Sequence, residues 1–145
     1  MGKVVIEVRN GPPAHPFLSP AIRAGDFVFV SGHIGVLPGR PAGEAGANWT
    51  PGELIEGGIE AETRQTLENL KQTLAAAGAS LSDVVKVNAF LRDVDRDFQA
   101  YNRVYLEYFS KEPPARTTVA AKIHGNILLE IECVAYAPVT PLGAK

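Results

Sequence analysis

The segment from Leu129 to Ala135 alternates strictly between apolar side chains and a second set that includes two glutamates, and this pattern constrains the fold strongly. Successive side chains of a β-strand point to opposite faces of the sheet, so the alternation predicts a strand with one buried face. The apolar face consists of Leu129, Ile131, Cys133 and Ala135, and the other face of Glu130, Glu132 and Val134. Another layer must therefore cover one face of this strand, while the opposite face presents two carboxyl groups.

A cationic side chain lies in the segment that precedes this strand. Arg116 begins a second strand-like run, and a glycine-containing hinge at 124–126 separates the two runs, which favours a hairpin. In a hairpin, Arg116 is expected within reach of Glu130 and Glu132 on the same side of the sheet. A guanidinium beside two carboxyl groups indicates a site for a small anionic substrate. The alternative is a structural ion pair between Arg116 and one of the glutamates.

Composition excludes several classes of function. Hydrophobic residues make up 46% and charged residues 21% of the 145 residues, as in ordinary globular chains, and we predict a single domain over residues 1–145. The formal net charge of -2 gives no basic field for nucleic acid. No apolar run approaches the roughly 18 residues of a membrane span. The early charges of Lys3 and Glu7 do not fit a signal peptide, so we expect a cytoplasmic protein.

Metal and disulfide chemistry are not expected either. Cys133 is the single cysteine, so the chain has no internal disulfide, and its place on the apolar face predicts a core residue. His15, His33 and His124 show no ligand spacing to one another. We therefore predict no metal site and no cofactor.

Hydrophobic spacing predicts five strands and a first helix. The strands cover Val4–Val8, Phe27–Gly32, Val84–Leu91 and the two C-terminal runs. Residues 37–48 are rich in Gly, Pro and Ala and are expected to form an exposed loop. Thr50-Pro51-Gly52-Glu53 has the form of a capping box. The helix behind it has apolar residues at helical spacing from Ile55 onward and ends at Gly78.

A second helix and the order of elements complete the predicted fold. Asp93 or Asp95 caps this helix, Pro113-Pro114 ends it, and one stripe carries Phe98, Tyr101, Tyr105 and Tyr108, as expected for a core-facing side. The order of elements predicts an α+β fold with both helices on one face of the sheet. The other face is left uncovered and carries Phe27 and Phe29, which indicates an oligomer.

Five segments in this order resemble the RidA/YjgF family of enamine/imine deaminases, from about Pro16 to Ala137. They are Ala24-Gly25-Asp26-Phe27-Val28-Phe29-Val30-Ser31-Gly32, Thr66-Leu67-Glu68-Asn69-Leu70, Tyr101-Asn102-Arg103-Val104-Tyr105, Pro114-Ala115-Arg116-Thr117-Thr118 and Glu130-Ile131-Glu132. The resemblance implies a chorismate-mutase-like fold with a single mixed sheet. It also implies a homotrimer with three clefts between subunits, in which enamine or imine acids are hydrolysed to 2-keto acids and ammonia without a cofactor.

The resemblance also implies roles for individual residues. Arg116 would hold the substrate carboxylate, and Glu130 would position the attacking water. Backbone groups around Ser31 and Gly32 and near Thr118 would also contact the substrate. Asn102 would be a substrate-binding residue at the subunit interface. Active members usually have a tyrosine before the second strand, and the matching place here is Leu18 or Phe17.

The same chemistry follows from the residue types. A planar guanidinium binds a carboxylate through two hydrogen bonds, as an ammonium does not. A carboxyl group beside a like charge has a raised pKa and can exchange protons with a water molecule. Two other classes stay open: a non-catalytic trimer that binds or senses a keto acid, and RNA cleavage or translation inhibition, against which the acidic composition argues.

Overall fold

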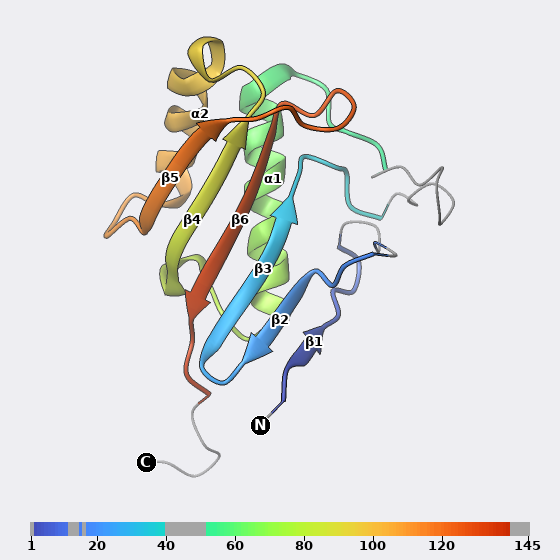
Figure 1. The fold of residues 1–145 in the computed structure, drawn as a ribbon, viewed down its shortest axis with the longest axis vertical. Helices are drawn as coiled ribbons and strands as arrows, with labels where there is room; N and C mark the ends of the chain where they lie inside the picture. Colours follow the sequence, from blue (N-terminus) through green and yellow to red (C-terminus); the bar gives the residue numbers. More distant parts are fainter. Residues whose placement is uncertain (1, 12–14, 16, 40–51, 140–145) are drawn as a thin grey trace.

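The structure is a computed structural model that describes residues 2–11, 15, 17–39 and 52–139. The elements in chain order are β1 (Val4–Ile6), β2 (Ala21–Ala24), β3 (Phe27–His33), α1 (Gly58–Ala76), a 3-10 turn (Leu81–Asp83), β4 (Val84–Leu91), α2 (Val94–Tyr108), β5 (Ala115–Ala120) and β6 (Leu129–Tyr136). Figure 1 shows the strands side by side with the helices behind them.

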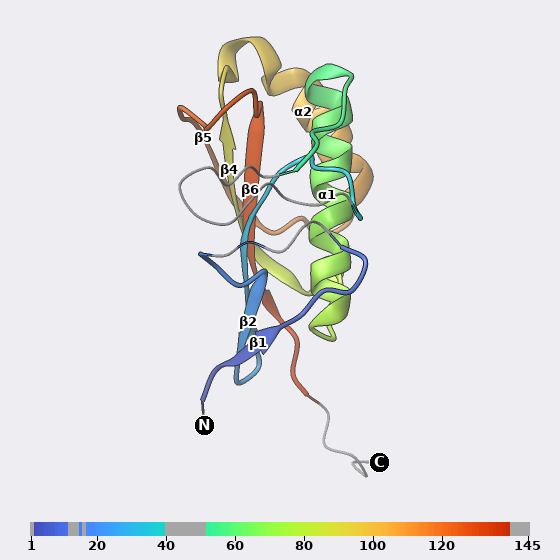
Figure 2. The same ribbon diagram turned by 90° about the vertical axis from the view of Figure 1, so that its right-hand side faces the viewer.

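The strands form one mixed sheet in the order β1-β2-β3-β6-β4-β5. All neighbouring pairs are antiparallel except β4 and β5, which run parallel. Both helices pack on the same face of this sheet, as the side view in Figure 2 shows. The predicted α+β class, with a single mixed sheet and two helices on one face, is confirmed.

The predicted hairpin between the two C-terminal strands is wrong. β4 lies between β5 and β6, and Val87 of β4 pairs with Arg116 of β5 in parallel register. Parallel strands need a long crossover connection, and α2 provides it between β4 and β5. The hinge at 124–126 therefore carries the chain past β4 and does not close a two-strand turn.

The first helix begins later than the predicted capping box. Thr50 and Pro51 lie outside the described residues, as does most of the predicted loop, but Glu53 and Ile55 are not helical. Glu53 O accepts a hydrogen bond from Leu37 N at 2.8 Å, and Ile55 N donates to Gly35 O at 2.8 Å, so this segment is extended. Gly57, the N-cap, and Gly58, the first residue of α1, have φ values of 121° and 75°, so the helix does not continue toward the N-terminus from here. The glycine pair therefore sets the helix start.

The other helix ends agree with the sequence. Gly78 N donates to Ala75 O and Ala79 N donates to Leu74 O, which is the Schellman arrangement expected at the end of α1. Asp93 caps α2 by accepting a hydrogen bond from Arg96 N at 3.0 Å, so Asp93 is the cap rather than Asp95. Strand β2 was not predicted, because it is only four residues long and contains Arg23.

The two sheet faces differ in burial. The helix-facing side is the core, which includes Val28, Val87, Ile131 and the α1 leucines Leu67, Leu70 and Leu74, all fully buried. We call the opposite side the open face; on it Phe27 is 43%, Phe29 48% and Tyr136 46% exposed. The Phe27 ring lies 5.3 Å from that of Tyr136, so these side chains form an exposed apolar patch. The predicted uncovered face with Phe27 and Phe29 is confirmed.

Candidate active site

The Glu130 side chain packs directly against the backbone at Gly32. Strand β6 places Glu130 on the open face, because its neighbours Leu129 and Ile131 are buried against the helices. A β-carbon added at Gly32 would lie 2.0 Å from Glu130 Oε1, which is closer than any real contact. The pairing of β3 and β6 is irregular between Val30 and His33, where Gly32 lies. Only glycine leaves room for the carboxyl group at this point of the sheet.

Burial raises the pKa of Glu130 above its ordinary value, and the like charge of Glu132 raises it further. Glu132 also lies on the open face, where it accepts a hydrogen bond from Asn88 Nδ2 at 3.2 Å. Among the described residues, none forms an ion pair or a hydrogen bond with the Glu130 carboxyl group. This carboxyl group therefore holds a proton to higher pH than an ordinary glutamate does, which suits a group that exchanges protons with a water molecule.

Ser31 directly precedes Gly32, and its hydrogen bonds tie it to the segment that follows Leu18. Ser31 Oγ donates to Ser19 O at 2.6 Å, and Ser31 N donates to Pro20 O at 3.0 Å. Leu18 precedes Ser19 in the chain and is 45% exposed. We call Leu18, Ser31, Gly32 and Glu130 the Glu130 subsite. It has an acid–base group, backbone polar groups and an apolar side chain, but no cation.

The cation lies in a second group of residues, on β5 and α2. Arg116 Nη1 donates to Asn102 Oδ1 at 2.9 Å. The Arg116 guanidinium carbon also lies 4.6 Å from the ring centroid of Tyr105. Thr118 Oγ1 is buried nearby and has no hydrogen-bond partner among the described residues. We call Arg116, Asn102 and Thr118 the Arg116 subsite.

The two subsites lie on opposite faces of the sheet, so the prediction that Arg116 and the glutamates share a face is wrong. Val87, the β4 partner of Arg116, is fully buried against the helices. Glu130 pairs instead with Phe90, which lies three residues further along β4 and points to the other face. The alternative of a structural ion pair with Glu130 or Glu132 is not realised: in the described part of the chain, no carboxylate pairs with Arg116.

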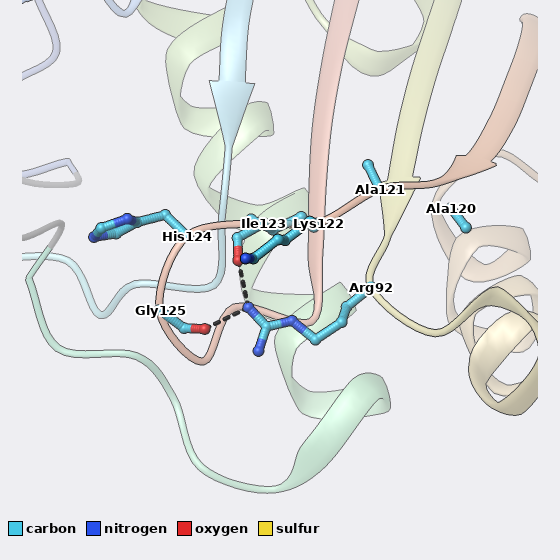
Figure 3. Close-up of a pocket in the computed structure, with 7 residues that line it drawn as sticks. All are labelled: Arg92, Ala120, Ala121, Lys122, Ile123, His124 and Gly125. Carbon is cyan, nitrogen blue, oxygen red and sulfur yellow. Dashed lines mark hydrogen bonds between the residues drawn. The ribbon is translucent and has the colours of Figure 1, made fainter.

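The connection between β5 and β6 lines a surface pocket at residues 120–125, and Arg92 anchors it (Figure 3). The Arg92 guanidinium donates to Ile123 O at 2.5 Å and also to Gly125 O. The His124 side chain points away from Arg92 in Figure 3. Glu62 of α1 accepts a hydrogen bond from Leu128 N at 2.9 Å, two residues before Glu130. These bonds fix the start of β6 and therefore the position of Glu130.

Several of these residues were not predicted from the sequence. Arg92 and Glu62 looked like ordinary charged residues, and only the tertiary structure shows that they bind backbone groups of one connection. Tyr101 and Tyr105 were expected on a core stripe, which is correct, but their contact with Arg116 was not expected. Their spacing of four residues, on a helix that precedes the strand carrying Arg116, was the available signal.

The described residues contain no group of three or more His, Cys, Asp or Glu residues placed to hold a metal ion. None of the described helices is long and apolar enough to cross a membrane.

Comparison with known proteins identifies the family. The family model described as Endoribonuclease L-PSP matches residues 8–137. A RutC family protein of Pyrococcus horikoshii is 43% identical over 136 residues, covering 92% of this chain and 98% of the relative. The chloroplastic Reactive Intermediate Deaminase A of Arabidopsis thaliana is 35% identical, over 92% of this chain and 65% of that protein. The chain belongs to this family, also known as the YjgF/RidA family, which confirms the resemblance.

Solved structures agree with this assignment. Yeast Mmf1 superposes with a TM-score of 0.80 at 32% identity, covering 94% of this chain and 99% of that one. E. coli TdcF, solved with bound serine, gives a TM-score of 0.76 at 29% identity, covering 92% and 98%. The fold of the chain is therefore that of the reactive-intermediate-deaminase family.

Proposed function

We propose that this protein hydrolyses reactive 2-enamine and 2-imine acids, such as 2-aminoacrylate and 2-iminobutanoate, to 2-keto acids and ammonia, without a cofactor. The reaction is proposed to take place in clefts between the subunits of a homotrimer. The family includes a relative named as a reactive intermediate deaminase, and TdcF was solved with a small amino acid bound. Serine carries a carboxylate next to a nitrogen-bearing carbon, as the proposed substrates do.

One observation carries the proposal. Arg116 and Glu130 are chemically complementary to such a substrate, and neither forms an ion pair within the described residues. Because they lie on opposite faces of the sheet, one chain does not bring them together. A second copy that packs its open face near the β5 edge of the first would join the two subsites. The exposed patch around Phe27, Phe29 and Tyr136 supports such packing.

The proposed chemistry divides between the subsites. Arg116 binds the substrate carboxylate through two hydrogen bonds. Protonation of the enamine at C3 gives the iminium, whose C2 is electrophilic. Glu130 takes a proton from a water molecule while the oxygen of that water bonds to C2, and a carbinolamine forms. The nitrogen then gains a proton, the C2–N bond breaks with its electron pair leaving on ammonia, and loss of the hydroxyl proton gives the keto acid.

The direct test is turnover of 2-aminoacrylate released in the assay by a serine dehydratase. Pyruvate and ammonia should form faster than in the spontaneous hydrolysis. A wild-type protein that gives only the spontaneous rate, yet is stabilised against heat by 2-ketobutyrate, would indicate the sensor function instead. That second function is favoured by Leu18, which supplies no hydroxyl where active members usually have tyrosine.

A third function, endoribonuclease activity, is named in the description of the family model. The formal net charge of -2 argues against it, because RNA-binding proteins usually carry a basic surface. A cytoplasmic location also stays a prediction, since the named relatives include mitochondrial and chloroplastic proteins.

A further inference from the structure

A cluster of buried hydroxyl groups surrounds Arg116 between α2 and β5. Tyr101 Oη, Tyr105 Oη and Thr118 Oγ1 are all buried, and none forms a well-aligned hydrogen bond within the described residues, although Tyr101 lies close to Thr118 and Arg116. Tyr101 is fully buried and Tyr105 is 4% exposed. A buried hydroxyl without a hydrogen-bond partner destabilises the folded chain. Core stability therefore does not explain why three such groups gather around one arginine.

The aromatic rings of α2 enclose the guanidinium. The Arg116 guanidinium carbon lies 4.6 Å from the Tyr105 ring centroid, 5.4 Å from that of Tyr101 and 5.9 Å from that of Phe98. The Tyr101 and Tyr105 rings lie 5.7 Å apart, and Asn102 accepts a hydrogen bond from Nη1 at 2.9 Å. Burial raises the pKa of Tyr101, while the nearby Thr118 hydroxyl and Arg116 act in the opposite direction. The hydroxyls therefore lie next to the cation.

Other arginines on this side of the molecule are neutralised by carboxylates. Arg64 Nη1 lies 2.5 Å from Glu107 Oε2, and Arg103 Nη2 lies 2.7 Å from Glu60 Oε1. Arg116 has rings and an amide oxygen in place of a carboxylate. Aromatic rings attract a guanidinium electrostatically but carry no net negative charge that would neutralise it. The positive charge of Arg116 therefore remains available to an external anion.

We propose that Tyr101 and Tyr105 are positioning residues, which hold the Arg116 guanidinium as an unpaired cation in the orientation that a planar carboxylate needs. The inference rests on the proposed function for the identity of the anion. The two tyrosines act through Arg116 and do not touch the reacting carbon. Their loss is therefore expected to weaken substrate binding more than it slows the chemical step.

The test compares Tyr105→Leu with Tyr105→Phe. Removing the ring should raise the Kd for 2-ketobutyrate by about 3- to 30-fold, the range expected for loss of a cation–π contact. KM should rise by a similar factor while kcat changes little. Tyr105→Phe keeps the ring and should recover most of the lost affinity. Tyr108→Leu is the matched control, because the Tyr108 hydroxyl bonds Glu68 at 2.9 Å, away from Arg116. Unchanged affinity in Tyr105→Leu would overturn the inference.

A second readout does not depend on turnover. The Arg116 guanidinium protons lie over aromatic rings, so their NMR signals should be shifted upfield, and Arg116→Lys should remove those signals. Tyr105→Leu should move them toward the position of a solvent-exposed arginine. Unshifted signals in the wild type would refute the inference that the aromatic rings enclose the guanidinium. Shifted signals in a wild type that binds no keto acid would support that inference and contradict the proposed function. If Tyr105→Leu does not fold, Tyr101→Leu is tested by the same criteria.

Discussion

Arg116 and Glu130 lie on opposite faces of one sheet, although only β4 separates the strands that carry them. Arg116 is held under α2 by Asn102 and three aromatic rings, and Glu130 lies against Gly32 on the open face. Under the proposed function, Arg116 binds the substrate carboxylate and Glu130 exchanges protons, yet the sheet separates the two groups within one chain. We therefore propose that the active site contains parts of two chains.

Gly32→Ala tests the close packing in the Glu130 subsite. The new methyl group would meet Glu130 Oε1 at 2.0 Å, so the carboxyl group must move away from its position. We expect turnover to fall by at least about tenfold, because proton transfer depends on a distance near 3 Å. Gly2→Ala is the control, since a β-carbon at Gly2 has open space around it. Equal rates for Gly32→Ala and the wild type would show that the position of this carboxyl group does not matter.

Arg116→Lys keeps the charge but loses the planar, two-pronged geometry. We expect at least about a tenfold loss of 2-ketobutyrate affinity, measured by calorimetry, with an unchanged circular dichroism spectrum. Arg103→Lys is the matched control on α2, because Arg103 pairs on the surface with Glu60. If the Arg116→Lys protein binds the keto acid as the wild type does, Arg116 is a structural residue.

Glu132→Gln tests the origin of the raised pKa of Glu130. The Glu132 charge is the second cause of that shift, after burial. Its removal should lower the pKa of Glu130, so the acidic limb of the kcat/KM profile should move to lower pH. Glu7→Gln, at an exposed position beyond β1, should leave the profile in place. An unmoved profile in Glu132→Gln would mean that Glu130 does not control the rate.

The same shift predicts how stability depends on pH. Because the folded-state pKa of Glu130 is raised, the unfolded chain releases this proton first as the pH increases. Glu130 therefore contributes stability below its ordinary pKa of 4.5, and this contribution is lost as the pH rises through the folded-state value. Urea titrations from pH 4 to pH 8 should show a smaller decline in unfolding free energy for Glu130→Gln than for the wild type. A steeper decline in the variant would contradict the burial of an uncompensated carboxyl group.

The sequence predicted the elements better than their pairing. Alternation at 129–135 and helical spacing around Leu67, Leu70 and Leu74 are local signals, and both elements formed as expected. The partner of β5 is a non-local choice that depends on the α2 crossover, so the hairpin prediction failed. The face on which Arg116 lies depends on that pairing. A raised pKa at Glu130, a substrate-binding Arg116 and a hydrogen-bonding Asn102 were predicted from the sequence. The hydrogen bond between Arg116 and Asn102, and the separation of Arg116 from Glu130 by the sheet, were not predicted.

The most direct test of the account is complementation between two inactive variants. Arg116→Lys chains retain Glu130, and Glu130→Gln chains retain Arg116. Alone, Glu130→Gln should lose roughly 100- to 10,000-fold in turnover of 2-aminoacrylate. Arg116→Lys alone should lose at least about tenfold in kcat/KM, because it binds the substrate carboxylate poorly. Co-expressed in equal amounts as mixed trimers, confirmed by light scattering, they should recover about a quarter of the wild-type rate. Half of the chains supply each intact subsite, and a site is complete only where the two meet. A mixture that remains as inactive as its components would contradict a site shared between chains.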